Sequence, residues 1–275
     1  MKKNRVIIIV SLALIAGLSL GLLNAALSFP GIVLPNASGI PVGEFGGIEL
    51  INDDFNSGVG TKLTEISCSM DHRQDNGDGK IEVYTETSSE YHANFSINQT
   101  IDGYDVMMVD FDLEIDNLDD TLSIYTVYRN SEGNIVGAAP GCSQYLNVFR
   151  NGDKLEYYVS VNGAFEHVGS SSLFAHITLI YRYNRDNYRA SDALVYVDGN
   201  YVTSIDGFIK SSVCKASSLR LHQLNTNNTS SPDCFYVDNY SVYVFETGYD
   251  GAINYLFGNT EYTLQECSDS ILFEK

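Results

Sequence analysis

The chain has 275 residues, of which 44% are hydrophobic, so it can form one globular domain with a leader and is not a disordered chain. Its formal net charge of -19 repels phosphates and argues against nucleic acid as a partner. A content of 23 Gly and 19 Tyr with only 5 Pro favours strands joined by tight turns.

The N-terminal segment has the pattern of an export signal. Three basic residues, Lys2, Lys3 and Arg5, precede the uncharged stretch 6–29. That stretch is long enough to cross a bilayer as a helix, and its basic flank orients the N-terminus inside and the body outside. Residues 1–29 are therefore expected to be a signal peptide or a membrane anchor, two alternatives that stay open. The expected location is extracellular or at the cell surface, with the protein secreted or held at the membrane by this helix.

Residues 30–47 are rich in Gly and Pro with little charge, and they are expected to form a linker. The body that follows, residues 48–246, repeatedly alternates apolar and polar residues, which is typical of strands with one buried face. The clearest example is the segment 109–116, where four apolar residues alternate with four acidic ones. Strands are predicted at residues 80–87, 109–116, 122–128, 145–149, 155–161, 176–183, 193–197, 218–224 and 235–245.

Turn signals separate these strands. The pairs Asn151-Gly152, Asn162-Gly163 and Asp198-Gly199 suit two-residue hairpin turns because they tolerate positive φ. No long stretch has the period of an amphipathic helix. The predicted fold is all-β, an antiparallel two-sheet β-sandwich of the jelly-roll type, preceded by the N-terminal hydrophobic helix. Residues 247–275 are expected to be a C-terminal tail that adds a strand or binds partners.

Five cysteines fit an oxidising compartment, and none has the spacing of a metal site. Cys214 and Cys234 flank a segment that resembles a strand followed by a long turn, and neighbouring strands would bring them together. A disulfide between these two cysteines is the first expectation. The alternative is that several cysteines are buried free thiols.

Three stretches in order, at residues 51–55, 194–202 and 235–243, resemble the concanavalin A-like lectin/glucanase superfamily, including laminin-G-like and family-16 glucanase-like jelly rolls. The resemblance covers about residues 48 to 246. It implies two curved antiparallel sheets with sugars bound on the concave one. The last stretch is similar to that family's closing strand, whose aspartate helps to hold a structural calcium. This implies Ca²⁺ ligands at Asp238 and at Asp53 or Asp54, which is reasonable chemistry for carboxylates. The alternative is that Asp238 caps a turn.

Glu114, Asp116 and Asp119 resemble the E-x-D-x-x-E motif of family-16 glucanases. The resemblance implies a nucleophile at Glu114, an assisting Asp116 and an acid/base at Asp119, since retaining glycosidases need two carboxyls across the sugar bond. However, Asp119 is one methylene shorter than Glu, and the chain has no Trp for the cleft. The simpler interpretation is a solvated acidic strand face that also includes Asp110 and Asp112. Whether the protein is an enzyme stays open, with the balance against catalysis.

Sugar recognition needs flat aromatic faces and polar groups for hydroxyls. The candidates for ligand binding are Tyr125, Tyr181, Arg182 and Tyr183, although tyrosines at half-buried sandwich positions have the same pattern. The predicted function is an exported cell-surface carbohydrate-binding or adhesion module, whose partner is a glycan or surface polysaccharide. The alternatives are a glycoside hydrolase of the glucanase-like type and a structural surface protein that self-assembles.

Overall fold

The computed structural model describes residues 41–56, 66–68, 71–74, 79–84, 91–100, 104–118, 121–134, 145–161, 164–182, 192–206, 214–224, 234–246 and 248–258. The predicted N-terminal helix lies outside these residues, as does most of the predicted linker. Within the described ranges, no helix has both the length and the apolar character needed to cross a membrane.

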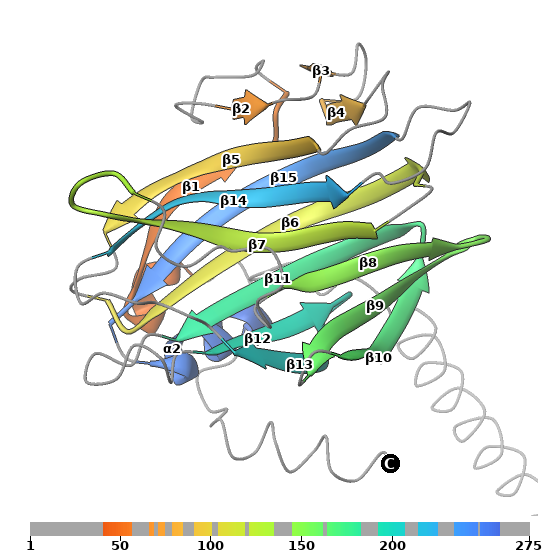
Figure 1. Ribbon diagram of the computed structural model, residues 1–275. Coiled ribbons are helices and arrows are strands. Elements are labelled where there is room, and N and C mark those ends of the chain that lie inside the picture. The colour runs from red at the N-terminus through yellow and green to blue at the C-terminus, as the bar shows by residue number, and fades with distance from the viewer. Residues whose placement is uncertain are drawn as a thin grey trace, which may run out of the picture. The chain divides into compact units, whose positions relative to one another are not determined.

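Two antiparallel sheets make up most of the described chain (Figure 1). In the first, sheet A, the strand order is β13 (Asn200–Asp206), β12 (Asp192–Val197), β11 (Phe174–Arg182), β6 (Val106–Asn117), β15 (Cys234–Phe245), β4 (Ile81–Tyr84) and β3 (Asp71–Gln74). β1 (Gly47–Asp53) pairs with the second half of β15, and β4 pairs with its first half. In sheet B, the order is β10 (Ala164–Ser172), β9 (Lys154–Val161), β8 (Leu146–Asn151), β7 (Thr121–Asn130), β14 (Cys214–Leu224), β5 (Tyr91–Thr100) and β2 (Ile66–Cys68).

One hydrophobic core lies between the two sheets. From β6 it takes alternate residues such as Phe111 and Leu113, and from sheet B it takes Phe95, Leu122 and Leu219. Side chains of both sheets therefore share one buried layer, as in a β-sandwich. The predicted two-sheet architecture is confirmed for the described residues. Below, the inner face of a sheet is the side that lines this core, and the outer face is the opposite side.

A short helix packs on the outer face of sheet A. α2 (Tyr249–Phe257) buries Ala252, Ile253 and Leu256 in a second apolar cluster with residues of sheet A such as Met108 and Phe245, and with Phe45 of the 3₁₀ helix η1 (Val42–Phe45). The expectation that the tail adds a strand is wrong for residues 249–257. Their apolar positions recur at intervals of three and four, which is the pattern of one helix face.

The hairpin predictions hold wherever the turn is described. Gly152, between β8 and β9, has φ 65°, and Asp198 and Gly199, between β12 and β13, have φ 51° and 73°. The turn at Asn162-Gly163 lies outside the described residues.

The expected disulfide between Cys214 and Cys234 is not formed, because Cys234 is a buried free thiol. The reason is topological. Cys214 begins β14, where it pairs with Asn130 in sheet B, whereas Cys234 begins β15, where it pairs with Asn117 in sheet A. The two strands are consecutive along the chain but belong to different sheets.

Candidate functional site

The outer face of sheet B carries a row of polar and aromatic side chains that crosses its central strands. In this row, Arg220 of β14 lies opposite Asn94 of β5 on one side and Tyr125 of β7 on the other. The Arg220 Nε donates to Asn94 Oδ1 at 2.7 Å, and its guanidinium carbon lies 5.9 Å from the centre of the Tyr125 ring. The neighbours Leu219 and Leu221 are buried in the core, so alternation directs Arg220 outward.

A second row runs beside the first and crosses five strands. Its members lie opposite one another in the strand registers, and they are His222 of β14, Ser123 of β7, Asn147 of β8, Tyr158 of β9 and His167 of β10. Ser123 Oγ donates to Asn147 Oδ1 at 2.7 Å. The two rows are joined where Tyr125 Oη lies 3.3 Å from His222 Nδ1.

Aromatic rings gather at both ends of these rows. Tyr125 stacks on Tyr145, with ring centres 4.2 Å apart and planes 24° apart. Toward the β10 edge, Phe149 meets Tyr158 and Phe165 edge to face, at 5.0 and 6.3 Å. Phe165 is 61% exposed, which is unusual for so large an apolar side chain. The outer face of sheet B thus has a polar centre and an exposed aromatic edge.

Burial fixes the polar centre in place. Tyr125 is 3% exposed and His222 8%, and Asn94 and Asn147 are also buried, while Arg220 is half-buried. Side chains held by packing and mutual hydrogen bonds are preorganised, which lowers the entropy lost when a ligand binds. The groups that they present are a guanidinium, an imidazole, a phenol and two amides.

One carboxylate borders the second row. Glu156 accepts from Asn151 Nδ2 at 2.7 Å and from the Tyr158 hydroxyl at 2.8 Å. The hydrogen bond from Asn151, and then that from Tyr158, lowers the pKa of Glu156. Glu156 therefore stays ionised, and it holds the Tyr158 ring from one side.

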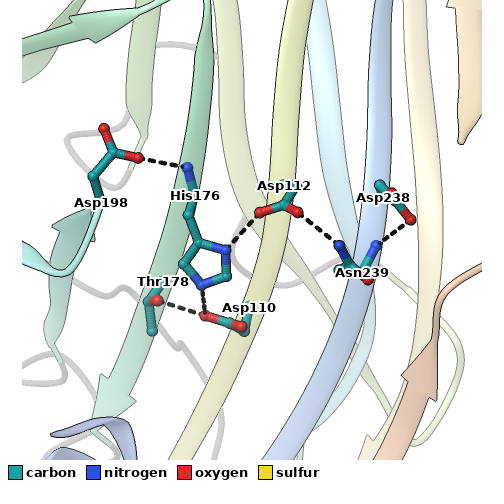
Figure 2. Close-up of polar contacts among 7 residues, drawn as sticks. All are labelled: Asp110, Asp112, His176, Thr178, Asp198, Asp238 and Asn239. Carbon is teal, nitrogen blue, oxygen red and sulfur yellow. Dashed lines mark hydrogen bonds and ion pairs between the residues drawn. The ribbon is translucent and has the colours of Figure 1, made fainter. Parts of the chain in front are cut away.

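A different cluster lies on the outer face of sheet A, beside α2. Figure 2 shows His176 of β11 between two aspartates of β6, with Nδ1 2.6 Å from Asp112 Oδ1 and Nε2 2.9 Å from Asp110 Oδ1. Thr178 Oγ1 donates to Asp110, and Asn239 Nδ2 donates to Asp112 Oδ2 at 2.7 Å. Asp110 and Asp112 are only 2% and 6% exposed, so their interpretation as a solvated strand face is wrong.

The charges in this cluster hold a proton on the imidazole. Burial alone would lower the pKa of His176, but the charge and hydrogen bond of Asp110, followed by those of Asp112, raise it to about 10. Buried charges are tolerated when they are paired and hydrogen-bonded. The imidazole of His176 and the carboxylates of Asp110 and Asp112 already have partners inside the cluster. We therefore assign this cluster a structural role rather than a role in ligand binding.

Two of the three predicted catalytic residues, Glu114 and Asp116, lie on the outer face of sheet A, whereas the two rows lie on sheet B. Glu114 and Asp116 share this face of β6, as alternation requires. Glu114 forms an ion pair with Lys80, and Asp116 is exposed. Asp119 lies outside the described residues.

The predicted ligand-binding residues are separated by the fold. Tyr125 belongs to the first row on sheet B, whereas Tyr181 is buried in the core between the sheets. Arg182 lies at the end of β11 and binds Asp192 with Nε and Nη2, at 2.9 and 3.0 Å. Tyr183 lies outside the described residues. Sequence reasoning did not select Arg220, His222, Asn94, Asn147 or Tyr158, although Arg220 and His222 stand at the polar positions of the predicted strand 218–224.

The predicted calcium ligands do not form a metal centre as a set. Within the described ranges, no three His, Cys, Asp or Glu side chains are grouped so that they could hold an ion. Asp54 and Asp238 each accept a nearby backbone N–H, those of Asn56 and Asn239. Asp53 is 2% exposed and accepts the N–H of Phe55, while its Oδ2 is buried without a hydrogen-bond partner in the described structure.

No family model and no curated protein matches this chain. Among solved structures, it is similar to an alginate lyase, Aly36B, with a TM-score of 0.48, 11% identity, and coverage of 74% of this chain and 98% of that one. It is similar to an endo-β-1,4-glucuronan lyase from the fungus Trichoderma reesei, with a TM-score of 0.44, 11% identity, and coverage of 71% of this chain and 95% of that one. It is also similar to a carbohydrate esterase from the Shiga toxin-encoding bacteriophage phi24B, with a TM-score of 0.45, 12% identity, and coverage of 73% of this chain and 100% of that one. With similarities this distant, the function has to be argued from the residues of the site.

Proposed function

We propose that this protein is an exported, concanavalin A-like surface module that binds a glycan along the outer face of sheet B. The observation that carries the proposal is the pair of cross-strand rows, in which Arg220, His222 and Asn147 are fixed in register with aromatic rings that lead to the exposed edge at β10. Sugars are bound by this combination, since aromatic faces pack on C–H groups and placed polar groups bond hydroxyls.

The extent of the rows suits a chain of sugars rather than a single one. Strands in a sheet lie about 4.8 Å apart, so the five strands from β14 to β10 span roughly 20 Å. Polar groups occupy the β14 and β7 end, and the rings of Tyr158 and Phe165 occupy the β10 end. An oligosaccharide lying across the strands would meet both kinds of contact.

Binding is favoured over hydrolysis at this face because neither row contains a carboxylate. Retaining and inverting glycosidases use two carboxyl groups on either side of the scissile bond. The carboxylate that borders the rows, Glu156, is already bonded by Asn151 and Tyr158. Glu114 and Asp116, which resemble a hydrolase motif, belong to the other sheet.

The test is a glycan array with the full-length protein, followed by affinity measurements on the glycans that bind. Tyr158→Ala should lower the affinity at least tenfold, because it removes a ring from the β10 end of the second row. The matched control is Tyr236→Ala, which removes a half-buried ring from the outer face of sheet A and should leave affinity unchanged. Absence of any glycan binding by a folded protein, or equal losses in both variants, would refute the proposal.

A further inference from the structure

Arg220 is a half-buried cation that forms no ion pair with a carboxylate in the described part of the chain. Its recorded contacts are the hydrogen bond from Nε to Asn94 and the approach to the Tyr125 ring. Arg182, by contrast, is bound by both oxygens of Asp192. Among the residues that the structure describes, this central arginine of the outer face of sheet B therefore has no acidic partner.

Within the described ranges, the contacts of Arg220 leave its two terminal nitrogens available for a ligand. A guanidinium has five N–H donors in a fixed fork, and the recorded hydrogen bond uses the one on Nε. The donors on the two Nη atoms match the two oxygens of a carboxylate or of a sulfate ester. Because Nε is tied to Asn94 and the ring of Tyr125 lies beside the guanidinium, the fork is held in one orientation before any ligand arrives.

The surroundings also favour an anion. The residues named in the two rows carry no negative charge, although the protein as a whole has a net charge of -19. Glu156 lies on β9, three strands away from Arg220 on β14, which is roughly 14 Å. That separation exceeds the Debye length of about 8 Å at physiological ionic strength, so Glu156 does little to repel an anion at Arg220.

We infer that the glycan is acidic, and that Arg220 binds an anionic group on one of its sugars through two parallel hydrogen bonds. The inference rests on the proposed glycan-binding face and names the class of glycan that this face takes. His222 and the Tyr125 hydroxyl, which lie together beside Arg220, then contact the same sugar. A sugar carboxylate and a sulfate ester are the two sources of such a group, and the experiment separates them.

The experiment measures calorimetric affinities of the full-length protein for three kinds of oligosaccharide. These are a panel of polyuronate fragments with different backbones, the carboxyl-reduced neutral form of each fragment, and sulfated dextran fragments. The bound polyuronate should bind at least tenfold more tightly than its carboxyl-reduced form, since reduction replaces the carboxylate by a neutral hydroxymethyl group and leaves the rest of the fragment unchanged. This comparison uses the wild-type protein alone, so it does not depend on whether a variant protein folds.

Variants then assign the effect to Arg220. Arg220→Gln should weaken binding of the acidic fragment about 10- to 100-fold and leave weak neutral binding within twofold, as expected for loss of a charge-assisted hydrogen bond. Arg220→Lys should lie between wild type and Arg220→Gln, because it keeps the charge and loses the fork. Lys154→Gln, which removes an exposed charge from β9 of the same sheet, is the control and should behave as wild type.

Each outcome decides something. Preference for sulfated dextran over every polyuronate assigns the anion as a sulfate ester and keeps the role of Arg220. Equal binding of acidic and neutral forms, with no effect of Arg220→Gln, overturns the inference while glycan binding itself stands. No binding to any of the three kinds of oligosaccharide overturns the inference, and the glycan array then decides whether the proposed glycan-binding function stands.

Discussion

His176 Nε2 lies 2.9 Å from Asp110 Oδ1, and the two side chains, 1% and 2% exposed, are buried on the outer face of sheet A. The other ring nitrogen contacts Asp112. An imidazolium thus bridges neighbouring acidic positions of β6, and it ties β11 to β6 at a point that the central core does not reach.

The first prediction concerns the pH dependence of stability. The pKa of His176 is raised from 6.5 to about 10 in the fold, so its contribution is complete below pH 6.5 and is lost as pH rises toward 10. His176→Gln should lower the free energy of unfolding by about 3–5 kcal/mol near pH 6, the cost of breaking a buried ion pair. The difference from wild type should shrink as pH rises, measured by denaturant unfolding at pH 6, 8 and 10. A difference that stays constant over this range would contradict the pairing.

The second prediction isolates one hydroxyl of the candidate site. Tyr125→Phe keeps the ring that stacks on Tyr145 and removes the oxygen beside His222. Glycan affinity should fall roughly 2- to 12-fold, the range for one hydrogen bond. The melting temperature should fall by a few degrees, because the buried His222 loses a hydrogen-bond partner. Tyr236→Phe removes a hydroxyl from sheet A and serves as the control. Equal affinities for Tyr125→Phe and wild type would show that the hydroxyl does not contact the ligand.

The third prediction tests the packing of α2. Leu256 is completely buried in the apolar cluster between α2 and sheet A, so Leu256→Ala should lower the free energy of unfolding by about 2–5 kcal/mol. Asp250→Ala, at an exposed position in the first turn of α2, should change it by less than about 0.5 kcal/mol. If the two variants were equally stable, α2 would not be docked on the sheet in solution.

Calcium binding stays a prediction, and Asp53 provides its test. If calcium takes the buried Oδ2 of Asp53, completed by backbone carbonyls, then millimolar Ca²⁺ should raise the melting temperature by several degrees. Asp53→Asn should abolish this rise, whereas Asp116→Asn, at an exposed carboxylate, should preserve it. A melting temperature that is the same in Ca²⁺ and in chelator would count against a calcium site at Asp53.

Much of the architecture could be predicted from local patterns. β6, β12 and β15 lie almost where alternation places them, because each has one face in the core. β10 was missed because all of its side chains are exposed or half-buried, so it lacks the apolar alternation that marks a strand. α2 was missed because nine residues with Gly251 in their midst give only a short helical pattern.

The site was harder to predict because it depends on strand register. Tyr125 was selected as an aromatic residue in a strand, but its neighbours Arg220 and Asn94 come from strands distant in the sequence. Burial of Asp110 and Asp112 depends in the same way on His176, which lies more than 60 residues later. An acidic residue in an alternating strand looks solvated until its partner is known.

The separation of the two outer faces has a consequence for how such a scaffold can change. The outward-facing side chains of β8, β9 and β10 point away from the shared core, while sheet A keeps its own stabilising cluster and helix. The side chains of Phe149, Tyr158 and Phe165 can therefore be replaced without repacking the interior. New specificities of the proposed glycan-binding face can be selected on sheet B while sheet A keeps the protein folded.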